Sequence, residues 1–203
     1  MEHLKHLGRY LLGRKRVETR FHRQRRSKSH LRTYTDSDWA GDVGNRKSTT
    51  GLIVLRGNHL LRHTSSLQAT VALSSAEAEF YAMTQGAAYT LGTQSYFRDW
   101  QVELTIACYS DASSGLSFAS RRGLGRMRHV ETRFLWLQER VALKHLRVTK
   151  VGTDDNPSDM LTKQLTPAKF VAFGESVGEY EIQSSKSGAL SALGNVGQRC
   201  ATG

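Results

Sequence analysis

From residue 33 onward the chain contains short runs in which β-branched, aromatic and polar residues alternate, a pattern typical of strands. Residues 33–36 resemble the end of one strand, and residues 50–55 form a second. Gly57 and Asn58 are a suitable two-residue hairpin turn into a third run at 59–63. The pattern therefore predicts three antiparallel strands at the start of a domain.

The following segments alternate between helical and extended patterns. Ser74 and Glu77 have the spacing of a capping box, which predicts a long helix from about residue 75 to the high 90s. A strand is expected at 104–109, and the run of small residues at 112–119 predicts a short helix after it.

A second stretch of alternating elements follows a loop rich in glycine and arginine. Apolar residues recur every three or four positions within 130–141 and predict another helix, and a short strand is expected at 146–151. Asn156 and Pro157 look like the N-cap and first residue of a helix through about residue 165. The order β-β-β-α-β-α-α-β-α predicts an α/β fold, a mixed sheet flanked by helices.

The two ends differ from this domain. Leu4, Leu7 and Leu11 have helical spacing and predict a short amphipathic helix, but the chain then becomes rich in arginine and loses periodicity. From Gly174 onward Gly, Ser and Ala dominate without a period, which predicts a flexible tail. We therefore expect three parts: a basic arm at 1–32, the domain at 33–170 and a flexible tail at 171–203.

Charge adds a possible partner to this picture. The formal net charge of the 203 residues is +11, and residues 1–32 carry most of it, with 11 Lys and Arg against 2 Glu. Such an arm is attracted to polyanions, either nucleic acid or an anionic membrane surface. The alternative interpretation is a solvated tail without a ligand.

Several classes of protein are excluded by what the chain lacks. Cys108 and Cys200 are the only cysteines and stand far apart, which argues against a disulfide framework or structural zinc. The chain has no apolar run long enough to span a membrane and no secretory signal, so we expect an intracellular protein without membrane association. It is also too short to hold a polymerase and a nuclease together.

Acidic residues at element ends supply the candidate chemistry. Asp36 follows the first strand, and Asp111 follows the strand after the long helix. Because sites in open α/β sheets gather at strand ends, these carboxylates are expected to meet, although an Asp after a strand is also common turn chemistry. Hydrolysis of a phosphodiester commonly uses two divalent metal ions, and Mg²⁺ prefers carboxylate oxygens.

Two further acids are chosen by their positions on helices. Glu77 and Glu79 point about 200° apart on a helix, so only one of them can face the sheet. Glu77 already has a use in the capping box, which favours Glu79 as the functional residue. Among the last acids of the domain, Asp159 is preferred over Asp154 and Asp155 because it lies inside the predicted helix, although its role there could be limited to a favourable contact with the helix dipole.

Six ordered motifs resemble the ribonuclease H domain of copia-type retrotransposon polyproteins, from the Pseudoviridae-like LTR elements. They occur in the family's order across residues 33–165: Tyr-Thr-Asp-Ser-Asp-Trp-Ala-Gly-Asp at 34–42, Arg-Lys-Ser-Thr-Thr-Gly at 46–51, Val-Ala-Leu-Ser-Ser-Ala-Glu-Ala-Glu-Phe at 71–80, Tyr-Ser-Asp at 109–111, Arg-His-Val-Glu-Thr-Arg at 128–133 and Asn-Pro-Ser-Asp-Met-Leu-Thr-Lys at 156–163.

The resemblance implies a ribonuclease H-like fold with a five-stranded mixed sheet, three antiparallel strands followed by parallel ones. It implies a tetrad of metal ligands at Asp36, Glu79, Asp111 and Asp159, with Asp36 bridging two Mg²⁺ ions that Mn²⁺ can replace. The implied activity is endonucleolytic cutting of the RNA strand of an RNA/DNA hybrid, which leaves a 3′-hydroxyl and a 5′-phosphate. The implied partners are that hybrid and the reverse transcriptase part of a parent polyprotein, in the cytoplasm or the nucleus.

A basic loop is expected to follow the backbone of the hybrid with little sequence readout. Its residues are Arg121, Arg122, Arg126 and Arg128, and His129 next to them is a further phosphate contact or an exposed histidine at a helix start. Cellular ribonucleases H carry a loop histidine before the last carboxylate. Residues 152–156 contain none, which leaves that role unassigned.

Two rival functions remain. The first is a catalytically inactive retroelement remnant that binds nucleic acid through its basic arm, and the presence of all four acids argues against it. The second is another nuclease of the same fold that acts on DNA, such as an integrase or a resolvase. The order of the motifs and the glutamate on the long helix favour the hybrid nuclease.

Overall fold

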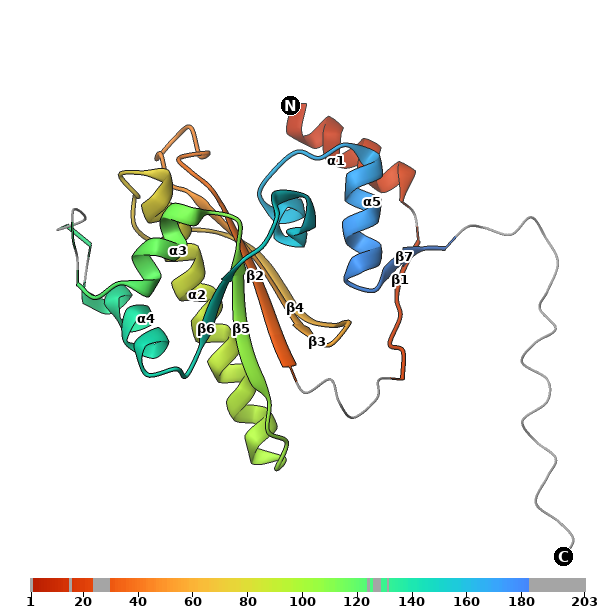
Figure 1. Ribbon diagram of the computed structural model, residues 1–203. Coiled ribbons are helices and arrows are strands. Elements are labelled where there is room, and N and C mark those ends of the chain that lie inside the picture. The colour runs from red at the N-terminus through yellow and green to blue at the C-terminus, as the bar shows by residue number, and fades with distance from the viewer. Residues whose placement is uncertain are drawn as a thin grey trace, which may run out of the picture. The chain divides into compact units, whose positions relative to one another are not determined.

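The computed structural model describes residues 2–14, 16–23, 30–123, 125, 129–130 and 132–182 (Figure 1). The chain divides into two compact units, residues 19–180 in one and residues 1–18 with 181–203 in the other. In the second of these, α1 (Glu2–Gly13) is the amphipathic helix that the leucine spacing predicts. No helix within the described ranges is long and apolar enough to cross a membrane.

A five-stranded mixed sheet forms the centre of the larger unit. Its strands are β2 (His30–Asp38), β3 (Thr49–Arg56), β4 (His59–Leu67), β5 (Thr105–Ser110) and β6 (Arg147–Lys150), in the spatial order β4-β3-β2-β5-β6. β3 pairs antiparallel with both β2 and β4, whereas β5 pairs parallel with β2 and β6. This order confirms the expected ribonuclease H-like fold class.

Helices cover one face of the sheet and bury the main core there (Figure 1). They are α2 (Ser75–Asp99), α3 (Ser113–Ser120) and α4 (Thr132–Ala142), all expected from the sequence. Ser74 caps α2, since its side chain accepts a hydrogen bond from the Glu77 N–H at 3.2 Å. Phe80, Met83 and Phe118 are buried between these helices and the sheet.

The helix predicted from Asn156 to about residue 165 is wrong in type and length. The segment forms one short 3₁₀ turn, η2 (Pro157–Leu161), and a second turn, η1 (Thr153–Asp155), directly precedes the segment. Asn156 does not cap a helix, because its side chain donates to the Thr35 carbonyl of β2 at 3.2 Å and accepts from Ser158 at 2.6 Å. These bonds hold the turn against the sheet and replace α-helical geometry.

The flexible tail predicted at 171–203 is wrong for residues 171–182. Helix α5 (Pro167–Ser176) extends into this range, and β7 (Glu179–Glu181) follows it and forms a two-stranded sheet with β1 (Val17–Thr19). Phe173 and Val177 are buried, which supplies the apolar anchors that the small neighbouring residues obscure in the sequence. The rest of the predicted tail, 183–203, lies outside the described residues.

Candidate active site

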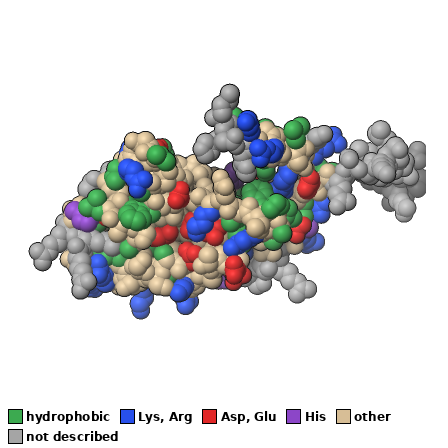
Figure 2. All heavy atoms as spheres, turned by 90° about the horizontal axis from the view of Figure 1, so that it is seen from above, with side chains coloured by type: hydrophobic (Ala, Val, Ile, Leu, Met, Phe, Trp, Pro, Cys, Tyr) green, Lys and Arg blue, Asp and Glu red, His purple; other side chains and the backbone are tan. Residues whose placement is uncertain are grey.

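Three acidic side chains meet at one edge of the sheet. Ligand oxygens of Asp36, Glu79 and Asp111 all lie within 4.8 Å of one another. In the parallel register of β2 and β5, Tyr34 pairs with Tyr109, so the two aspartates two residues later arrive at corresponding positions. Figure 2 looks at this edge from above and shows acidic side chains gathered near the middle of the face, with basic side chains among them. We name Asp36, Glu79 and Asp111 the acid cluster.

Glu79 is a buried carboxylate whose two oxygens have different surroundings. Its Oε1 accepts a hydrogen bond from the Ser37 N–H at 3.1 Å, whereas its Oε2 is buried and has no hydrogen-bond partner in the described protein. Burial, with the nearby charge of Asp36, raises the pKa of Glu79 to about 8. Burial also raises the pKa of Asp36, which is 1% exposed. A divalent cation would offset the cost of burying the charges of Glu79 and Asp36, because it supplies positive charge. It would also give the unpartnered oxygen of Glu79 a ligand bond.

Asp159 lies next to the acid cluster and is linked to it through a lysine. The Nζ of Lys163 is 2.9 Å from Oδ1 of Asp36 and 3.0 Å from Oδ1 of Asp159. Burial alone would lower the pKa of Lys163, but the hydrogen bonds and charges of the two aspartates outweigh burial and raise it. Thr162 also donates to Asp36 through its hydroxyl. The ammonium group thus holds a positive charge between two buried carboxylates.

The competing acids of the last loop have other surroundings. Asp154 is exposed and pairs with Lys169 of α5 at 3.0 Å. Asp159 is 1% exposed and contacts the same Lys163 ammonium as Asp36 of the cluster. Thr153 donates a hydrogen bond to Oδ2 of Asp111 at 2.9 Å, so the same loop also orients a member of the cluster.

Glu77 is a buried structural residue, as its place in the predicted capping box suggested, but its partners are different. Its carboxylate accepts from the Leu73 N–H at 3.1 Å, from the Tyr81 hydroxyl at 2.5 Å and from His129 Nε2 at 2.7 Å. No sequence pattern indicated the contact with His129, which lies 52 positions away. The contact holds His129, three residues before the start of α4, against helix α2.

The predicted substrate loop is described only in part. The Arg121 guanidinium lies 4.3 Å from the centre of the Phe118 ring, and Arg122 is exposed. Arg126 and Arg128 lie outside the described residues. Sequence reasoning also missed Lys163, although its position four residues after Asp159 is the spacing of a helical ion pair and was a usable signal.

Comparisons with known proteins agree with the motifs. No family model matches the chain. The retrovirus-related Pol polyprotein from transposon TNT 1-94 of Nicotiana tabacum is 36% identical over 151 residues, which are 73% of this chain and 11% of that polyprotein. The corresponding polyprotein from transposon RE2 of Arabidopsis thaliana is 30% identical over 164 residues, 79% of this chain and again 11% of the polyprotein. The chain therefore spans about a tenth of the curated relatives it matches.

One solved structure with a similar fold is that of a ribonuclease H1 isolated from compost by a metagenomic approach. It shares 17% sequence identity with this chain at a TM-score of 0.44, and the match covers 66% of this chain and 92% of that one.

Proposed function

This chain is homologous to a segment of the Pol polyproteins of copia-type plant retrotransposons, and we propose that it is a ribonuclease H that cuts the RNA strand of RNA/DNA hybrids. The observation that carries the proposal is the acid cluster, in which three carboxylates from β2, α2 and the end of β5 approach within 4.8 Å. Asp36 and Glu79 are buried and Asp111 is half-buried, and holding three such acids together is costly unless a cation compensates them. Metal-dependent hydrolysis is the chemistry that uses such a group.

The donor set fits hard divalent cations. All four predicted ligands, Asp36, Glu79, Asp111 and Asp159, offer carboxylate oxygens, which suit Mg²⁺ and Mn²⁺. Two such ions, when bound, would activate the attacking water and stabilise the leaving 3′-oxygen. Asp36 is the central residue of the proposal, because it belongs to the acid cluster and also shares the Lys163 ammonium with Asp159.

Lys163 has a defined part in this scheme. Its ammonium compensates Asp36 and Asp159 in the metal-free protein, and its side chain is 40% exposed, so it can swing toward solvent. A cation that binds between the two aspartates would then take the place of the ammonium, so the two negative charges would be balanced both before and after metal binding. The neighbouring Thr162 hydroxyl and Ser37 N–H would continue to orient Asp36 and Glu79.

Substrate contacts are assigned by the same proposal to the basic loop. Arg121, Arg122, Arg126 and Arg128 would contact backbone phosphates, which gives affinity without base readout. His129 contacts Glu77, and this contact supports a role for His129 in fixing the end of the loop. The exposed part of the His129 ring could still contact a phosphate. Recognition of a hybrid would rest on its shape and on the 2′-hydroxyls of the RNA strand.

The test is cleavage of an end-labelled RNA/DNA hybrid by the full chain with Mg²⁺ or with EDTA. We expect cutting of the RNA strand alone, only with Mg²⁺, and none by Asp111→Asn. Asp154→Asn is the matched control, because it removes an exposed carboxylate of the neighbouring loop and should cut normally. Cutting of RNA/RNA or DNA/DNA duplexes would contradict the assignment, and a folded protein that binds hybrid without cutting it would favour the inactive remnant.

A further inference from the structure

A basic groove lies on the helical face of the sheet, at the edge where β5 and β6 begin. It has a volume of about 940 Å³ and lies between α2, α4, β5 and β6. Four cationic side chains line it: Arg98 near the end of α2, Arg140 of α4, Lys144 in the turn after α4, and Arg147 at the start of β6. None of its described lining residues is acidic. These four residues define the basic groove.

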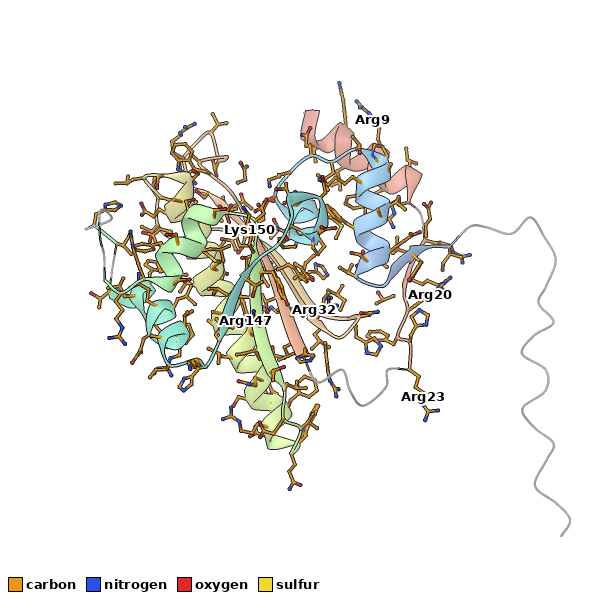
Figure 3. All side chains as sticks on the ribbon, in the orientation of Figure 1. Arg9, Arg20, Arg23, Arg32, Arg147 and Lys150 are labelled. Atoms are coloured by element: carbon orange, nitrogen blue, oxygen red, sulfur yellow. The ribbon has the colours of Figure 1, made fainter. Side chains whose placement is uncertain are left out.

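The groove is separate from the acid cluster. Asp36 and Asp111 lie toward the ends of β2 and β5, whereas the groove is lined by Thr105 and Ile106, the first residues of β5. In Figure 3, Arg147 lies toward the beginning of β6, and Lys150 lies at the end of β6 that is nearer to the acidic edge. The evidence for a nuclease site at the acid cluster therefore gives no role to the groove.

The cationic side chains of the groove form few ion pairs within the described part of the protein. Within the described part of the chain, neither Arg98 nor Arg147 has an ion-pair partner, and both side chains are exposed. Arg140 contacts Glu139 at 3.4 Å and His145 Nδ1 at 3.3 Å, and its Nε is buried without a hydrogen-bond partner. A buried guanidinium N–H that lacks an acceptor is uncommon, because leaving it unpaired costs free energy. An anionic oxygen bound in the groove would supply the missing acceptor.

We propose that the basic groove binds the phosphate backbone of a nucleic-acid strand, at a second site apart from the acid cluster. A strand offers a row of regularly spaced phosphates, and cations from three different elements, α2, α4 and β6, match a row better than they match one small anion. The net charge of +11 attracts the same ligand at long range. The floor beneath the cations is apolar, with Leu104, Ile106 and Leu146, and therefore provides contact without base-specific hydrogen bonds.

The test is the salt dependence of binding between the full chain and a short fluorescein-labelled oligodeoxythymidylate, measured by anisotropy in EDTA. Each phosphate contact with a single strand contributes about 0.7 to the magnitude of the slope of log K against log salt. We expect Arg98→Ala and Arg147→Ala each to lower that magnitude by about 0.7 and to weaken binding about three- to tenfold at about 50 mM KCl. Arg62→Ala is the matched control, since Arg62 is an exposed arginine on the opposite edge strand, β4, and should leave the slope unchanged.

Two further measurements make the result specific. Hydrogen exchange of the amides at 143–148 should slow when the oligonucleotide is added, because these residues border the groove. Poly-L-glutamate of matched charge should compete poorly. Equal slopes for Arg147→Ala and Arg62→Ala, or equal competition by polyglutamate, would overturn the proposal. The assay measures binding in EDTA and needs no cutting, so a protein that binds the oligonucleotide through the groove but does not cut hybrid would contradict only the nuclease assignment, and the two failures are distinguishable.

Discussion

Buried charge is the feature that sets the behaviour of single residues in this protein. Glu79 is 8% exposed, and its pKa is raised to about 8 from an ordinary value of 4.5. Between these two values the folded protein holds a proton that the unfolded chain has lost. Stability therefore falls as the pH rises through this window, because the folded state binds more protons there.

The first prediction is a pH profile of thermal unfolding in EDTA. The melting temperature of the wild type should fall between about pH 5 and pH 8, and that of Glu79→Gln should fall less, since the amide cannot ionise. Differential scanning calorimetry of both proteins across this range measures the effect. Parallel profiles for the two proteins would show that Glu79 does not titrate in this way.

The second prediction concerns Lys163. Replacing it with Met in EDTA removes the ammonium that Asp36 and Asp159 share, and we expect the free energy of unfolding to fall by about 1–3 kcal/mol. Mg²⁺ should restore part of the loss. Urea unfolding gives the value, with Lys169→Met as the control, because its partner Asp154 is exposed and the pair contributes no more than about 1 kcal/mol. Equal losses in the two variants would contradict the part given to Lys163.

At the scale of elements, the close packing of α2 on β2 determines where Glu79 lies. Gly86 permits this approach, since a Cβ there would lie 2.6 Å from Cγ2 of Thr35 and 3.2 Å from Cγ2 of Thr33. Thr35 is fully buried directly before Asp36. A larger residue at position 86 would therefore push the helix away from the strand that carries the site.

The third prediction compares two glycines of the same helix. Gly86→Ala should destabilise the protein by about 1–3 kcal/mol through overpacking. Gly92→Ala meets no atom within 4 Å and should stabilise it by about 0.5–1 kcal/mol, because alanine favours the helix. Chemical denaturation of both variants is sufficient. A stabilising Gly86→Ala would show that α2 does not pack this closely.

The elements also show how far sequence patterns reach. Periodicity and the Ser74 cap correctly predicted α2, and alternation predicted the strands, because both signals are local. The segment after Asn156 was misassigned because its conformation depends on a distant hydrogen bond to Thr35. Helix α5 was not predicted, because its buried Phe173 and the neighbouring Val177 stand among small residues without a period.

At the scale of the whole molecule, the uneven charge and the sheet topology act together. The parallel pairing of β2 with β5 brings together acids that lie 75 positions apart in the chain, Asp36 and Asp111. The positions of Asp36 and Asp111 at the ends of two strands were enough to predict that their side chains meet. The salt bridges of Lys163 and the contact of Glu77 with His129 could not be inferred so easily, because they depend on side-chain directions after packing.

The fourth prediction follows from the net charge of +11. In EDTA, the affinity for an RNA/DNA hybrid should fall roughly tenfold or more between about 50 and 200 mM KCl, because the release of counterions from the phosphates contributes less free energy at high salt. Two hybrids of equal length and different sequence should bind equally. Filter binding tests both points, and a strong preference for one sequence would show that base edges are read.

The most direct test of the central claim compares the two glutamates of α2 in one cleavage assay. Glu79→Gln should retain its fold and lose Mg²⁺-dependent cutting of the hybrid's RNA strand, because it removes a member of the acid cluster. Glu77→Gln should keep the cutting chemistry and lose stability, because Glu77 holds Tyr81 and His129 and lies outside the cluster. Circular dichroism melts of both variants separate folding from chemistry. Full activity in folded Glu79→Gln, with activity lost in folded Glu77→Gln, would contradict the account.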